Sequence, residues 1–192
     1  MSDAAPPPRR SRVTLWLIIA LAAAPVAASY LLYYFSPPAH TVNYGELIEP
    51  LPLPDVPLVL ADGSPFRLSQ LRGKWVLVSL DSGRCDAQCD QKLLYMRQLR
   101  LTQGKERERV ERAWLILDGV SPSAAVLEPY PGTWAVRADA ALARLFPAPA
   151  SPSDHIYVVD PLGNVMMRFP RDPEPRGMIK DLQRLLKASQ VG

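Results

Sequence analysis

The sequence has little net charge and no internal repeat. Its formal net charge is +3, and its basic residues are scattered among acidic ones rather than gathered with aromatic side chains into a stripe. A nucleic-acid surface needs such a stripe, so the sequence predicts no nucleic-acid partner. Without the N-terminal apolar stretch and the segment after it, the 192 residues are enough for one ordinary domain and not two.

Charged side chains are also missing from Val13 to Phe35. At about 1.5 Å of rise per residue, a helix of this length can cross a hydrocarbon core of roughly 30 Å. Three of the residues 9–12 are arginines, whereas the next basic residue after the run is Arg67. This asymmetry predicts that residues 1–12 form a cytoplasmic tail and that residues 13–35 form a single transmembrane anchor in a bacterial-type inner membrane. The C-terminal domain is then expected in the periplasm.

A cleaved signal peptide is the alternative for the same segment. The small residues Val26, Ala27 and Ala28 are suitable for a signal peptidase after a shorter apolar core. However, the apolar run continues through Tyr30 to Phe35, which favours a stop within the bilayer. Either reading exports the domain.

Proline is abundant in residues 36–55, and basic residues are absent there, which predicts an extended tether. His40, within it, is interpreted as an interfacial polar residue. Residues 56–192 are expected to form the folded domain. Their apolar patterns and turn signals predict strands over 56–60, 66–68, 75–80, 113–117, 156–159 and 164–169, and helices over 91–103, 138–146 and 178–188, the first continuing as a charged stretch to 112. This order predicts an α/β domain with a thioredoxin-like mixed sheet flanked by helices.

The two cysteines, Cys85 and Cys89, directly follow the buried strand predicted over 75–80. The carboxyl end of a central strand opens onto the ligand crevice of an α/β sheet, and the following helix N-terminus stabilises a thiolate. On a helix the two sulfurs share one face about 6 Å apart along the axis, close enough to bridge or to hold one metal ion.

A purely structural disulfide is the alternative for this pair, because cysteines in an oxidising compartment usually pair. Closing so short a loop contributes only roughly 2 kcal/mol, against about 4.7 kcal/mol for a loop of a hundred residues. The position and the small loop therefore favour a functional role.

The charges around the pair are acidic on balance. Arg84 favours a thiolate, whereas Asp81, Asp86 and Asp90 oppose it and favour a bound cation. Two thiolates are soft ligands, so the ion expected in competition is Cu(I), or Zn(II) if nitrogen ligands join them.

Three segments resemble the Sco/SenC family: residues 68–79 (LSQLRGKWVLVS), 85–89 (CDAQC) and 156–163 (IYVVDPLG). The similarity extends over about residues 50–188, and the C-x-x-x-C spacing is its most specific part. The family consists of membrane-anchored, thioredoxin-like proteins that bind copper and assist assembly of the binuclear copper site of cytochrome c oxidase. The resemblance therefore implies copper as the cofactor and the copper-site subunit of the oxidase as the partner.

The resemblance also implies metal ligands. Cys85 and Cys89 correspond to the family's two copper-binding cysteines, and His155 is the candidate for its histidine ligand, although the family position falls near Pro152 here. The alternative for His155 is an ordinary histidine at a strand start, bonded to Asp154 or to solvent. Both readings stay open.

Three functions follow. The first is a Sco-like assembly factor that works through the cysteine pair by copper delivery or by thiol reduction, and is a metallochaperone rather than a turnover enzyme. The second is a periplasmic thiol-disulfide oxidoreductase, in which Cys85 attacks a partner disulfide and Cys89 resolves the mixed disulfide. The third is a degenerate, non-catalytic protein that docks on the oxidase.

Overall fold

The computed structural model describes residues 10–35 and 43–189. The chain divides into two compact units, residues 1–42 and 43–192. The predictions for the tail residues 1–9, for His40 and for the tether residues 36–42 lie outside the described residues.

Helix α1 (Arg10–Phe35) is the described helix of the first unit. Its stretch Val13–Leu32 has a mean hydropathy of 2.1, and none of it is buried. Among the described helices it alone is long and apolar enough to cross a membrane. The apolar helix expected over 13–35 is thereby confirmed.

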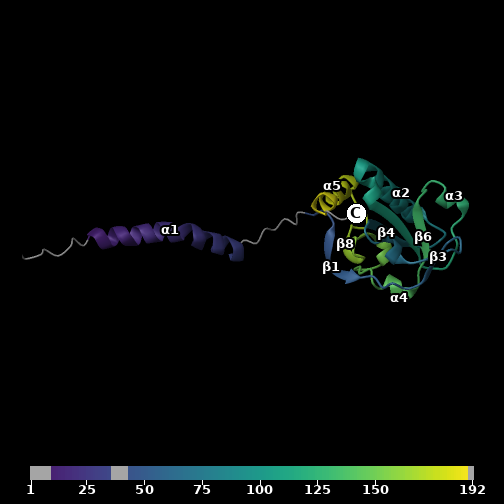
Figure 1. The fold of residues 1–192 in the computed structure, drawn as a ribbon, viewed down its shortest axis with the longest axis horizontal. Coiled ribbons are helices and arrows are strands. Elements are labelled where there is room, and N and C mark those ends of the chain that lie inside the picture. The colour runs from purple at the N-terminus through teal and green to yellow at the C-terminus, as the bar shows by residue number, and fades with distance from the viewer. Residues whose placement is uncertain (1–9, 36–42, 190–192) are drawn as a thin grey trace, which may run out of the picture. The chain divides into compact units, whose positions relative to one another are not determined.

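The second unit is built on one eight-stranded sheet with the strand order β1-β8-β7-β4-β5-β6-β2-β3 (Figure 1). The strands β4, β5 and β6 run parallel, and the other neighbours pair antiparallel. Its elements are β1 (Glu46–Pro52), β2 (Leu58–Leu60), β3 (Pro65–Phe66), η1 (Leu68–Leu71), β4 (Trp75–Asp81), α2 (Ala87–Thr102), η2 (Gly104–Arg109), β5 (Val110–Ile116), α3 (Ala124–Leu127), β6 (Thr133–Arg137), α4 (Ala140–Ala143), η3 (Pro152–Asp154), β7 (Ile156–Val159), β8 (Asn164–Arg168) and α5 (Pro175–Ala188).

Strand β4 lies in the middle of the sheet, and all seven of its residues are buried. Its side chains alternate between two cores, as the period of a strand requires. Leu77 packs with α2 and α5 on one face, and Val78 packs with Phe146 on the other. The mixed sheet flanked by helices that the sequence predicted is therefore confirmed.

Residues 46–52 are not part of a tether, contrary to the prediction for 36–55. They form β1, which pairs with β8 through Glu46↔Arg168 and Pro52↔Asn164. Most of this strand is exposed. Proline is tolerated in an edge strand because the position of its missing N–H faces solvent and not a neighbouring strand. Exposure and proline made an edge strand look like a linker.

The chain enters the domain through a fastened segment. The Tyr44 hydroxyl accepts a hydrogen bond from the Glu174 N–H at 2.7 Å, and the Gly45 N–H donates to Asp181 Oδ2 at 2.7 Å. Tyr44 packs so closely on Gly177 that a Cβ there would overlap its ring. The folded domain therefore starts at about residue 44, and not at residue 56 as predicted.

Two local differences concern the second half of the sheet. Residues 133–137 form β6, which the sequence did not predict, because only two of its five residues are fully buried. The charged stretch after α2 ends at Arg109, where β5 begins at Val110, and the helix expected over 138–146 is the short α4.

Candidate functional site

A disulfide joins the two cysteines where β4 passes into α2. Their Cα atoms lie 5.1 Å apart. Cys85 belongs to the loop and is partly exposed, whereas Cys89 lies in the first turn of α2 and is 1% exposed. A partner molecule can therefore reach Cys85 and not Cys89.

The first turn of α2 is capped at the cysteine pair. The Asp86 side chain accepts a hydrogen bond from the Cys89 N–H at 2.9 Å, and the Asp90 N–H donates to the Asp86 carbonyl at 2.9 Å. The partial positive charge of a helix N-terminus stabilises a thiolate in this turn, and the Asp86 carboxylate opposes it.

The carboxylate of Asp118, after β5, fastens the loop that carries Cys85. It accepts hydrogen bonds from the Ser82 hydroxyl at 2.5 Å, the Gly83 N–H at 3.0 Å and the Val120 N–H at 3.1 Å. These bonds, with that of Gly83 the strongest cause, lower the pKa of Asp118 to about 2. The two loops approach so closely that a Cβ at residue 83 would overlap the Val120 carbonyl oxygen, so this position requires glycine. We call this arrangement the Asp118 clasp.

Cys85 has a left-handed backbone conformation, with φ +48, and is the one non-glycine residue with positive φ among those described. Such a conformation costs on the order of 1–3 kcal/mol and persists where neighbouring contacts impose it. Its N–H donates to the Ser82 carbonyl at 3.1 Å, next to the Asp118 clasp. Cys85 is thus held in a fixed orientation.

A buried ion pair adjoins the disulfide. Lys92, three residues after Cys89 in α2, lies 2.7 Å from Asp81 Oδ1 at the end of β4, and both side chains are less than a tenth exposed. Lys92 also donates to the Ser153 carbonyl. Burial raises the pKa of Asp81 to about 6, although Lys92 acts in the opposite direction. Lys92 therefore links β4, α2 and the η3 loop.

A second link joins α2 to the segment before β6. The Tyr130 hydroxyl donates to Asp90 Oδ1 at 2.6 Å. Burial, and secondly this hydrogen bond, raise the pKa of Tyr130 to about 12. The hydroxyl therefore stays protonated and keeps donating to Asp90 near the disulfide. Neither Lys92 nor Tyr130 was predicted, because nothing in their local sequence marks them as buried.

His155 lies at the start of β7 and is 9% exposed. Its Nδ1 lies 2.7 Å from the Phe169 carbonyl oxygen, which can only accept, so Nδ1 donates this hydrogen bond and, in the neutral ring, Nε2 has the lone pair. Its partner is therefore not Asp154, which pairs with Arg171 at 3.4 Å.

Cys85, Cys89 and His155 do not form one metal-binding group in the structure. Among the described residues, no three His, Cys, Asp or Glu side chains come together in a group that could hold a metal ion. The structure brings Cys85 and Cys89 together and leaves His155 outside such a group. When reduced, the two sulfurs alone fit a soft ion such as Cu(I).

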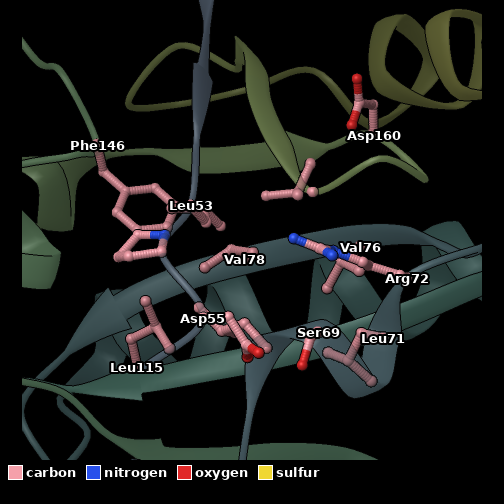
Figure 2. Close-up of a pocket in the computed structure, with 14 residues that line it drawn as sticks. Leu53, Asp55, Ser69, Leu71, Arg72, Val76, Val78, Leu115, Phe146 and Asp160 are labelled. Atoms are coloured by element: carbon pink, nitrogen blue, oxygen red, sulfur yellow. The ribbon is translucent and has the colours of Figure 1, made fainter. Parts of the chain in front are cut away.

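An apolar pocket lies on the face of the sheet opposite to the one on which Cys89 packs. Figure 2 shows the side chains that line this pocket. Its lining includes Leu53, Val78 and Phe146. Its volume of about 20 Å³ is room for about one water molecule. Neither cysteine lines this pocket, so it is separate from the candidate site.

A mixed sheet with a disulfide at the carboxyl end of its central strand, one cysteine partly exposed and the other buried, defines a thioredoxin-like domain. A family model described as "transmembrane-like, thioredoxin-like, C-terminal domain" matches residues 75–189, more than half of the chain. The chain belongs to this family. No curated protein sequence matches it as a relative.

Solved structures with the same fold include copper-bound Sco1 from yeast, with 16% identity, a TM-score of 0.57, and 78% of this chain and 96% of that chain covered. Copper-bound ScoI from Bradyrhizobium japonicum has 18% identity and a TM-score of 0.52, over 73% of this chain and 99% of that one. A thiol:disulfide interchange protein of the thioredoxin family from Chlorobium tepidum has 21% identity and a TM-score of 0.52, over 73% and 97%. The resemblance to Sco structures expected from the sequence is confirmed as a likeness of fold.

Proposed function

We propose that this protein is a membrane-anchored, Sco-like assembly factor that reduces the cysteine pair of a copper site, with the copper-site subunit of cytochrome c oxidase as its acceptor. The observation that carries the proposal is the unequal exposure of the pair: Cys85 partly open, Cys89 buried at 1% exposure. Thiol exchange needs one cysteine that attacks and one that is shielded until it resolves. The proposed anchor is α1, with the domain in the periplasm.

The exchange starts from the reduced pair. The Cys85 thiolate attacks one sulfur of the acceptor disulfide, whose other sulfur leaves as a thiolate. Cys89 then attacks the Cys85 sulfur of the mixed disulfide, so the Cys85–Cys89 bond forms and the second acceptor sulfur leaves. The acceptor gains two electrons and two protons, and Cys85 and Cys89 lose the same number of each, with the protons exchanged through solvent. A dithiol protein on the same side of the membrane is required to reduce the pair again.

Trapping of the mixed disulfide tests this order of attack. With Cys89→Ser, the covalent complex with the acceptor is expected to accumulate, because nothing resolves it. Cys85→Ser is the matched control, and it is expected to trap nothing because Cys89 is buried. Equal trapping by the two variants, or trapping by neither, contradicts the proposal.

Copper delivery by the same pair is the second candidate function, and the tautomer of His155 favours it. A histidine that ligates a metal commonly donates its other N–H to a carbonyl, as His155 does to Phe169 at 2.7 Å. Its Nε2 lone pair is the nitrogen donor that a third copper ligand requires. The test is the Cu(I) stoichiometry of the reduced protein against a competing chelator, with Cys85→Ser and His155→Ala beside it. No uptake by the native protein contradicts copper delivery and leaves the trapping result unaffected.

A further inference from the structure

The exposed face of α5 carries only positive charge. The one acidic residue within this helix, Asp181, is 1% exposed and turned inward, where it accepts from the Gly45 N–H. Four exposed cations spaced three or four residues apart share one side of the helix, and we call them the basic stripe: Arg176, Lys180, Arg184 and Lys187.

The stripe differs from the charged surface of the neighbouring η2 segment. There, charges of opposite sign alternate and pair, with Arg109 2.9 Å from Glu106 and Arg107 3.0 Å from Glu108. In the stripe, Arg184 pairs with the buried Asp181, at 3.6 Å. Since the whole chain has a formal net charge of only +3, the stripe is a local concentration of charge and not a general excess.

The stripe lies on the helix beside which the chain enters the domain. Tyr44 packs on Gly177 and accepts from the Glu174 N–H, so the first described residues of the domain contact the start of α5. Figure 1 shows β1 and α5 as neighbours within the domain. Only eight residues, 36–43, separate Phe35 at the end of α1 from Tyr44 in the sequence, so the segment that joins the domain to α1 is short.

We infer that the basic stripe binds the anionic lipid headgroups of the membrane in which α1 is anchored, so that the domain rests on the bilayer through α5. Each lysine or arginine near an anionic lipid surface raises the binding constant of the protein for that surface by about fivefold. This attraction decays within a Debye length of about 8 Å from the surface. The tether supplies a high local concentration of lipid. The inference rests on α1 being an anchor and is independent of the cysteine chemistry.

The mode of binding follows from the other side of α5. Met178, Leu182 and Leu186 are buried in the domain core, so this helix has no apolar face free for insertion into the acyl region. Binding is therefore electrostatic, at the headgroup level, and is weakened by salt.

Lysine acetylation on the full chain tests the inference. The protein is reconstituted in vesicles of phosphatidylcholine alone or mixed with phosphatidylglycerol, labelled with a membrane-impermeant reagent and analysed by mass spectrometry. Lys180 and Lys187 are expected to react several-fold more slowly on the anionic vesicles, and high salt is expected to abolish the difference. Lys74, which lies just before β4, is the internal reference and is expected to react equally on both.

A pair of matched variants separates the stripe from net charge. Arg176→Gln with Lys180→Gln is expected to weaken binding to the anionic vesicles by about fivefold for each cation removed, and so to abolish most of the several-fold protection of Lys187. Arg137→Gln with Arg144→Gln removes the same charge from exposed positions on other elements and is expected to leave that protection intact.

Three results overturn the inference. The first is equal reactivity of Lys180 and Lys187 on both kinds of vesicle. The second is loss of protection in the control variant to the same extent as in the stripe variant. The third is protection that appears only when membrane proteins are added, which assigns the stripe to an acidic protein partner instead of lipid.

Discussion

Replacement of Lys92 by methionine should destabilise the domain by an amount that depends on pH. Methionine keeps most of the apolar stem and removes the ammonium group that lies 2.7 Å from Asp81 Oδ1. Removing one partner of a buried pair costs about 3–5 kcal/mol, because the other charge stays buried without compensation. The Ser153 carbonyl also loses its donor.

The pH dependence follows from Asp81. Its pKa in the folded domain, about 6, lies above the ordinary value of 3.8, so Asp81 stabilises the fold fully below about pH 4, and this contribution is lost as the pH rises through 6. Without Lys92 the pKa of Asp81 rises further, so the free energy of unfolding of the variant continues to fall to a higher pH. The variant should therefore lose about 3–5 kcal/mol near pH 8. Near pH 5, where Asp81 is mostly protonated in both proteins, it should lose only about 1–2 kcal/mol.

Urea unfolding of the oxidised domain, followed by tryptophan fluorescence at the two pH values, measures this difference. Lys187→Met is the matched control, because Lys187 is an exposed lysine, and its effect is expected within about 0.5 kcal/mol of zero. The double variant Asp81→Leu with Lys92→Met should recover much of the loss, since no unpaired charge remains. Equal destabilisation near pH 5 and pH 8, or a loss below about 1 kcal/mol near pH 8, refutes the reasoning.

Three further changes test the surroundings of the disulfide. Asp118→Asn should speed reduction of the disulfide by dithiothreitol several-fold, because the loop is released. In the native protein the Asp118 clasp should be intact above pH 3.8 and should weaken as the pH falls towards the Asp118 pKa of about 2. Titration of Asp118 should therefore cause no change in the reduction rate of the native disulfide with pH near neutrality. Gly83→Ala should lower the melting temperature in calorimetry by an amount equivalent to about 1–3 kcal/mol, because the Val120 carbonyl blocks the added Cβ. Tyr130→Phe should cost about 1–2 kcal/mol in urea unfolding through the lost bond to Asp90, and no change there contradicts the proposed link.

The position of the cysteine pair could be predicted because local signals define it. A continuous apolar run marks β4, and the spacing of apolar residues after Cys89 marks α2. The junction of the two elements places Cys85 at the carboxyl end of the strand without any knowledge of distant contacts.

The parts that could not be predicted depend on contacts between distant segments. Asp118 reaches Ser82 across 36 residues, and the Glu46–Arg168 bond closes across 122. Lys92 occupies a helical position where a lysine is normally solvated, and only the packing of β4 and η3 against α2 buries it. Long-range pairing, not local preference, fixes these features.

The fastening of Tyr44 and Gly45 has a mechanical consequence. A pull on the chain from its N-terminal side meets the hydrogen bonds to Glu174 and Asp181 before it reaches the ladder between β1 and β8. The load is thereby shared with α5, whose inner face is packed into the core. The edge strand is thereby protected from being peeled off the sheet one hydrogen bond at a time, because α5 takes part of the load before β1 does.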